Sequence, residues 1–173
     1  MLKQFLFCLT VIVLFASGCA SGGWRVVDGG EFTVEFPGQP IDTATAVGDA
    51  AGAKLYFIPA ESGIDSNIYY AVSVYTLDDS AEIMGDLMDE IMLKDAEIYA
   101  WSMGAFLSDS GKVVKSGNYT GYEYTIFLAQ NSGILKMRKF AKGKHLYTLV
   151  VITGNEYLGN RDIYKFLDSF KLK

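Results

Sequence analysis

The 173-residue chain is poor in histidine, cysteine and proline, with one, two and three residues of each. A protein zinc site draws several ligands from histidine and cysteine, so we expect no such site here. A serine nucleophile would have to use His145, and the sequence has no G-x-S-x-G elbow. His145 follows Lys144 at an expected turn-to-strand junction and is interpreted as an ordinary half-exposed strand residue. We therefore expect no metal, no cofactor and no catalytic residue.

Both cysteines lie near the N-terminus, in a segment typical of a secretory signal peptide. Lys3 precedes an apolar run over residues 5–16, which is interrupted only by Cys8 and Thr10. As a helix this run would measure about 18 Å, which is too short for a bilayer core of about 30 Å. A positive start, a short apolar core and small residues after it favour a signal peptide over a membrane span.

The exit from the apolar run resembles the bacterial lipobox. Residues 16–18, Ala-Ser-Gly, lead directly into Cys19, although leucine is usual at the position of the alanine. The resemblance implies that residues 1–18 are removed and that the Cys19 thiol is acylated, with residues 19–23 as lipidated cysteine and flexible tether. No aspartate follows Cys19, so the outer membrane, facing the periplasm, is favoured if the host has two membranes. The alternative is a plain secreted protein with a cysteine there by chance.

Residues 24–173 are expected to form one globular domain without a thiol or a disulfide, because Cys8 leaves with the signal peptide and Cys19 carries lipid. Eleven Tyr and eleven Phe against three Pro indicate an ordered, sheet-rich chain that is long enough for a hydrophobic core. The formal net charge is −5, and loss of Lys3 makes the domain more acidic. Nucleic acid is therefore not expected as a partner, because its binding depends on neutralising phosphates.

The first part of the domain has the alternation and turn residues of β-strands. Residues 31–36 (EFTVEF) alternate polar and apolar side chains, and the PGQP sequence after them is expected to be a turn. Residues 43–47 and 53–58 are predicted to pair with each other. Residues 67–77 are predicted to form a long strand, because they are rich in β-branched and aromatic side chains.

A long helix is predicted next, followed by an antiparallel meander and a second helix. Residues 79–82 have the form of a capping box, and the first helix is expected to end by Gly104. Its apolar stripe is predicted to contain Ile83, Leu87, Ile91 and Ile98, and its acidic outer face Asp86, Asp89, Glu90, Asp95 and Glu97. These carboxylates are interpreted as a solvated face, with a hard cation such as calcium as the alternative.

The meander and the closing helix complete an α+β pattern. The expected strands cover residues 112–116, 122–129, 134–140 and 146–153. Helical spacing puts Ile163, Phe166, Leu167 and Phe170 on one apolar stripe against the sheet. The order of elements predicts an α+β fold in which helices pack on an antiparallel β-sheet.

Several of these segments together resemble the PsbP-like superfamily. They are the strand ending in FPGQP, the long helix after an aromatic strand, the GYEY strand, KHLYTLVV and the closing FLDSFKL. The superfamily includes the PsbP extrinsic proteins of photosystem II, the Ran-binding Mog protein and many bacterial lipoproteins. The resemblance covers residues 24–173 and implies an α-β-α sandwich with a non-catalytic binding or assembly role. It implies no universal site residues, so none is transferred to this chain.

One charged segment is a candidate binding site. Lys136, Arg138, Lys139, Lys142 and Lys144 fall within one expected hairpin, with no acidic residue between them. Alternation places Lys136 and Arg138 on one face of the sheet and Lys139 on the other. These residues are candidates for docking an anionic partner or lipid headgroups. The alternative is a solubilising hairpin whose lysines discourage edge-to-edge pairing.

From these observations we expect a lipid-anchored cell-envelope protein that contacts the membrane through Cys19 and binds a protein partner without catalysis. Two other functions stay open. An envelope hydrolase would use paired carboxylates, whose separation is set by the fold. A small-ligand or cation-binding lipoprotein would hold its ligand through carboxylates or other polar groups.

Overall fold

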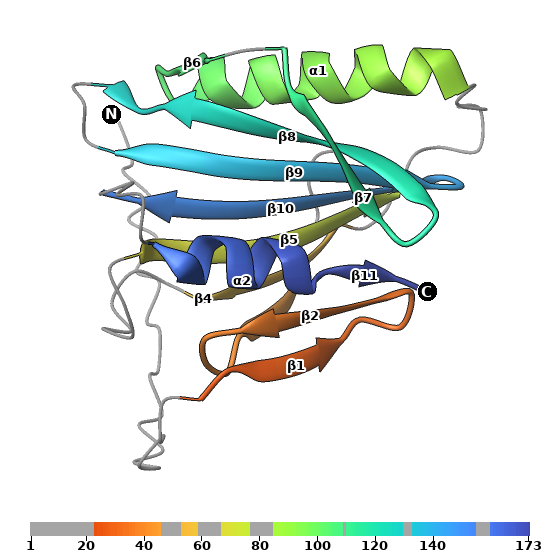
Figure 1. Ribbon diagram of the computed structural model, residues 1–173, viewed down its shortest axis with the longest axis vertical. Helices are drawn as coiled ribbons and strands as arrows, with labels where there is room; N and C mark the ends of the chain where they lie inside the picture. Colours follow the sequence, from red (N-terminus) through yellow and green to blue (C-terminus); the bar gives the residue numbers. More distant parts are fainter. Residues whose placement is uncertain are drawn as a thin grey trace, which may run out of the picture.

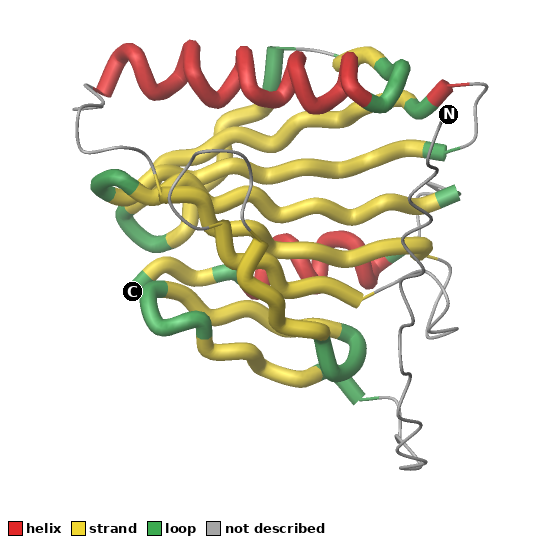
Figure 2. The backbone as a smooth tube through the Cα atoms, turned by 180° about the vertical axis from the view of Figure 1, so that it is seen from behind, coloured by secondary structure: helices red, strands yellow, loops and turns green. Residues whose placement is uncertain are grey.

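The computed structural model describes residues 23–45, 53–58, 67–76, 85–108, 110–129, 133–154 and 160–173. The expected signal peptide, Cys19 and the capping box at residues 79–82 lie outside these ranges. The described residues form two antiparallel sheets and two helices, which confirms the expected antiparallel α+β class (Figures 1 and 2).

The larger sheet has eight strands, with β10 at its centre between β5 and β9 (Figure 1). Along the sheet the order is β3 (Ile41–Thr45), β4 (Ala53–Ile58), β5 (Asn67–Thr76), β10 (His145–Thr153), β9 (Ile134–Lys142), β8 (Tyr119–Phe127) and β6 (Phe106–Leu107), with β7 (Lys112–Ser116) also paired to β8. The predicted pairs β3–β4, β8–β9 and β9–β10 are therefore present. β9 and β10 pair in register from His145↔Lys142 onward.

A smaller sheet joins the beginning and the end of the domain. It consists of β1 (Arg25–Asp28), β2 (Phe32–Phe36) and β11 (Lys171–Leu172), with β2 in the middle. β11 runs antiparallel to β2 and pairs Lys171 with Thr33. The short strands β1, β6 and β11 were not predicted, because two to four residues carry too little alternation to identify a strand.

Helix α2 (Arg161–Ser169) and the small sheet cover one face of the larger sheet (Figure 1). The predicted stripe is confirmed, because Ile163, Phe166 and Leu167 are buried and Phe170 is buried just after the helix. The ring of Phe166 lies 5.1 Å from that of Phe36 and 5.3 Å from that of Tyr70. These aromatic contacts join α2 to β2 and β5 in a single core.

Helix α1 (Gly85–Ser102) packs on the opposite face, over β8 and β9. Ala96 and Ala100 are buried against Tyr124 and Met137, and the small side chains allow the helix to approach the sheet closely. The helix ends at Ser102, by Gly104 as predicted, and the φ of +64° at Gly104 favours glycine. The amide of Ala105 donates to the carbonyl of Ala100 at 2.9 Å, which is the long bond of a Schellman cap.

Two expectations about the layers need correction. Leu87 and Ile98, predicted on the buried stripe of α1, are 50% and 63% exposed, whereas Met92 and the alanines are buried. Apolar residues occur on more than one side of this helix, so spacing alone did not identify the side that meets the sheet. The arrangement is also more sheet-rich than a simple α-β-α sandwich, because β1, β2 and β11 share the layer of α2.

Candidate functional site

The structure does not bring the five predicted docking residues together on one exposed surface. Lys136 and Arg138 are each 8% exposed and Lys139 is 1% exposed, whereas Lys142 is partly exposed and Lys144 is exposed. β9 is paired on both sides, by β8 and β10, so its basic residues do not protect a sheet edge. The docking hypothesis therefore keeps only Lys142 and Lys144, at the turn between β9 and β10.

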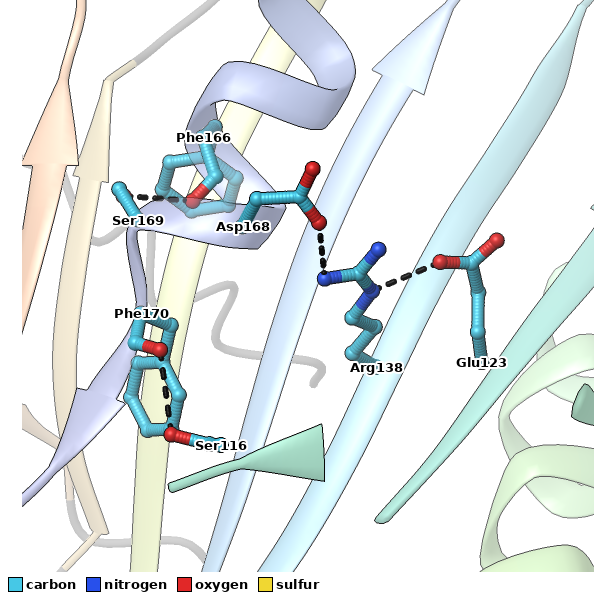
Figure 3. A network of polar contacts seen from close by, with 7 residues as sticks. All are labelled: Ser116, Glu123, Arg138, Phe166, Asp168, Ser169 and Phe170. Carbon is cyan, nitrogen blue, oxygen red and sulfur yellow. Dashed lines mark hydrogen bonds and ion pairs between the residues drawn. The ribbon is translucent and has the colours of Figure 1, made fainter. Parts of the chain in front are cut away.

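Arg138 connects two strands to helix α2 (Figure 3). Its Nε donates to Oε2 of Glu123 on β8 at 2.7 Å, and its Nη1 donates to Oδ1 of Asp168 on α2 at 2.7 Å. Arg138 and Glu123 are buried, while the Asp168 side chain is 64% exposed. The guanidinium thus positions the end of α2 on the sheet. On the same face, Nζ of Lys136 donates to Oγ1 of Thr125 at 2.8 Å.

Lys139 points to the other face of the sheet, as alternation predicted. Its ammonium group contacts the carboxylate of Asp95 on α1 and donates to Oγ1 of Thr148 at 3.0 Å. Burial lowers the pKa of Lys139, and the negative charge of Asp95 opposes that change. Two of the three buried cations of β9 therefore each attach one helix to the sheet, Arg138 for α2 and Lys139 for α1.

An open groove lies beside the exposed end of the β9–β10 hairpin. It is lined by Gly29, Glu31, Phe32, Lys54, Val74, Thr76, His145 and Tyr147. We call this set the hairpin groove. Its walls come from the β1–β2 turn, the beginning of β4, the end of β5 and the beginning of β10. These segments meet at the end of the molecule where the C-terminus lies, on the right in Figure 1.

Charged groups of both signs form the rim of the hairpin groove. Nζ of Lys142 donates to Oε2 of Glu31 at 2.5 Å and to the carbonyl oxygen of Lys173 at 2.7 Å. Lys173 in turn pairs with Asp28 at 2.7 Å. The hydrogen bond from Lys142 lowers the pKa of Glu31, and the same bond raises the pKa of Lys142. Lys54 lies 3.7 Å from Asp42.

The floor of the groove is aromatic and contains a polar atom without a partner. Tyr147 is fully buried, and its hydroxyl has no hydrogen-bond partner among the described residues. Its ring packs 5.9 Å from that of Phe32 and 6.3 Å from that of His145, whose Nδ1 is 3.1 Å from Oγ1 of Thr76. Burial raises the pKa of Tyr147. An unsatisfied buried hydroxyl costs about 1–3 kcal/mol, so its presence beside a groove calls for a reason.

Sequence reasoning did not predict any of the residues that line this groove. The two predicted residues that remain candidates, Lys142 and Lys144, lie in the turn beside it, and His145 was interpreted as an ordinary strand residue. Glu31 and Lys54 were missed because they reach the groove from distant segments, and an isolated charged residue in the sequence does not indicate a binding site.

A second groove lies beside α2, and two carboxylate side chains, Glu35 and Asp168, are among the residues that line it. Asp168 accepts a hydrogen bond from Arg138.

The described ranges contain no group of three or more His, Cys, Asp or Glu side chains placed to hold a metal ion. In the same ranges, neither α1 nor α2 combines the length and the apolar character needed to cross a bilayer.

Comparison with known proteins identifies a fold rather than a sequence family. No protein-family model matches the sequence, and no curated protein sequence matches it either. The solution structure of cyanobacterial PsbP (CyanoP) from Synechocystis sp. PCC 6803 is similar, with a TM-score of 0.57 at 11% identity over 92% of this chain and 99% of that one. A crystal structure from Bacteroides thetaiotaomicron VPI-5482 matches with a TM-score of 0.44 at 11% identity, over 88% of this chain and 48% of the other. The domain therefore has a PsbP-like fold.

Proposed function

We propose that the chain is a lipid-anchored cell-envelope protein whose PsbP-like domain is a non-catalytic binding or assembly module. The lipid anchor is Cys19, on the evidence of the apolar run and the small residues before it. The partner is another envelope protein, which docks at the hairpin groove. The observation that carries this docking site is the buried Tyr147 hydroxyl, which has no partner among the described residues and lies under an open groove.

The composition of the groove favours a protein segment as its occupant. Phe32 and Tyr147 supply an aromatic floor, while the pairs Lys142–Glu31 and Lys54–Asp42 lie at the rim. An apolar centre with a polar, charged rim is the usual anatomy of a protein–protein interface. The rim ion pairs are solvent-exposed, so they contribute to the choice and orientation of a partner more than to affinity.

The docking proposal is tested by crosslinking the full-length protein in native membranes. The variant Lys54→Glu/Lys144→Glu changes two exposed cations, Lys54 in the groove lining and Lys144 next to the lining residue His145. Its control is Lys94→Glu/Lys112→Glu, with two exposed cations elsewhere. The pair is matched, because Lys54 and Lys94 each take part in one exposed salt bridge, with Asp42 and Glu97. We expect a stoichiometric partner to be captured by the control and lost from the groove variant. Equal capture by both would remove the groove as the docking site.

The lipid anchor is tested separately, by palmitate labelling and membrane fractionation of the full chain beside Cys19→Ser. We expect the label and membrane attachment in the unmodified chain, and loss of both in the variant. If the unmodified chain takes up no palmitate and fractionates like Cys19→Ser, the lipid anchor is refuted.

A further inference from the structure

Five large apolar side chains are exposed where α1 ends. Ile98 is 63% exposed, Trp101 81%, Met103 37%, Phe106 65% and Phe127 41%. We call these five residues the α1-end surface. Ile98 and Trp101 are three residues apart in the helix and so lie on the same side of it. Phe106 of β6 pairs with Phe127 of β8, and their rings are 5.8 Å apart. Exposed apolar groups gathered in this way mark an interaction surface.

The segment around this surface can be transferred from water into a nonpolar environment without burying a charge or an unpaired amide. Residues 98–107, IYAWSMGAFL, include no charged side chain, in a chain of which 20% of the residues are charged. At the turn after α1, the amides of Met103, Gly104 and Ala105 all donate to helix carbonyls at 2.9–3.1 Å. The hydroxyl of Ser102 donates to the carbonyl of Tyr99 at 2.7 Å. Because these donors are already satisfied, a nonpolar environment would not leave them unpaired.

The α1-end surface and the beginning of the domain face the same way in Figure 1, although they lie near opposite ends of the longest axis of the molecule. The end of α1, β6 and the end of β8 are on the left in Figure 1, and so is the beginning of β1; Figure 2 shows the same arrangement from behind. The hairpin groove is on the opposite side. A tether over residues 19–23 extends to at most about 17 Å. An acylated Cys19 would therefore hold the beginning of β1 close to the membrane, and the α1-end surface meets the same membrane plane when this side of the domain lies along it.

We infer that the α1-end surface sits in the interfacial region of the bilayer that carries the lipid anchor. The inference rests on the proposed anchoring through Cys19. Lipid is the occupant that fits best, because tryptophan and phenylalanine prefer the membrane interface and because this surface faces the same way as the tethered end of the domain. In this orientation the hairpin groove faces away from the membrane, where an envelope partner can reach it.

Trp101 is itself the probe for the test, because the chain has only two tryptophans, Trp24 and Trp101. Full-length lipidated Trp24→Phe is reconstituted in phosphatidylethanolamine–phosphatidylglycerol vesicles with and without acyl-chain bromines. We expect the bromines to reduce Trp101 fluorescence at least twofold. The control is Tyr119→Trp with both native tryptophans changed to phenylalanine. Its single tryptophan lies beside Lys142, at the opposite end, and we expect its fluorescence to stay unchanged.

Two further arms separate the possible failures. Ile98→Glu/Phe106→Glu replaces exposed residues and is expected to abolish the quenching of Trp101 while the protein still floats with the vesicles. Flotation with unquenched Trp101 in the parent would overturn the membrane contact and leave the anchor standing. If palmitate is not incorporated and the protein does not float, both the anchor and the contact are refuted.

A second measurement avoids the Trp24 substitution, because Trp24 packs against Tyr70 and under Lys165 and its replacement alters both contacts. The native chain labelled with 5-fluorotryptophan gives one fluorine signal for each tryptophan. A spin label in the acyl chains should broaden the Trp101 signal. An unbroadened Trp101 signal in protein that floats would refute the membrane contact.

Discussion

Replacing Asp95 with alanine should destabilise the domain through the charge that it leaves behind. The Lys139 side chain is 1% exposed, and its ammonium group contacts the carboxylate of Asp95 and donates to the hydroxyl of Thr148. Removing one member of a buried ion pair typically costs 3–5 kcal/mol. The Asp95 side chain is 49% exposed, so solvent already screens the pair, and we expect the lower limit of about 3 kcal/mol.

The same substitution should matter little once Lys139 is gone. Lys139→Met removes the buried charge and keeps most of the volume, so we expect a change in stability of less than about 1 kcal/mol. In that background Asp95→Ala should cost less than about 0.5 kcal/mol, because only an exposed side chain is lost. The coupling energy of the double-mutant cycle is then about 2–3 kcal/mol.

The penalty should also depend on pH. Burial already lowers the pKa of Lys139 below its ordinary 10.5, and loss of Asp95 lowers it further. At pH values between that lowered pKa and 10.5, Lys139 releases its proton in the folded variant and keeps it in the unfolded chain. The free energy of unfolding of Asp95→Ala therefore rises with pH, and its difference from the unmodified protein shrinks. Urea unfolding at pH 6 and pH 9.5 measures this. A penalty that is independent of pH and of Lys139 would refute the reasoning.

Three other outcomes follow from the packing. Gly121→Ala should lower the free energy of unfolding by more than about 2 kcal/mol, because its Cβ would lie 2.2 Å from the carbonyl oxygen of Lys139. Gly143→Ala has open space but a φ of +56°, so it should cost about 1 kcal/mol. Equal losses of stability for the two variants in thermal unfolding would contradict this reasoning. Phe166→Ala should cost about 3–5 kcal/mol in urea unfolding, and a loss below 1 kcal/mol would show that the core is not continuous there. Burial raises the pKa of Tyr124 to about 12, so between pH 10 and 12 the folded state keeps a phenolic proton that the unfolded chain releases. Stability should fall over this range, and less steeply in Tyr124→Phe; identical slopes in the two proteins would argue against it.

Local pattern was enough to predict the elements whose partners are close in sequence or whose apolar stripe is unambiguous. Helix α2 is an example, because Ile163, Phe166 and Leu167 form a single narrow stripe that has only one side to bury. The β9–β10 hairpin was equally predictable, since its two strands are separated by a short turn with Gly143 at a φ of +56°. In both cases the information needed is contained within about twenty residues.

Helix α1 and the basic segment were harder, because the deciding partners lie in distant elements. The side of α1 that meets the sheet is set by Ala96 and Ala100, which allow close approach, and not by its larger residue Ile98. The charges on β9 looked like a docking patch because their counterions come from α1, α2 and β8. Sequence shows the cations together but cannot show that Asp95 and Asp168 are brought to them by the fold.

The pairing of β2 with β11 has a consequence for how the chain acquires its structure during synthesis. β2 emerges early, yet one of its two neighbours is formed by Lys171 and Leu172, near the other end of the domain. Until those residues emerge, Phe32 and Phe36 lack the cover that Phe166 and Phe170 provide. A domain with such long-range closure cannot complete its core progressively from the N-terminal side. The early apolar strands therefore stay without this cover until the last residues of the domain have been made.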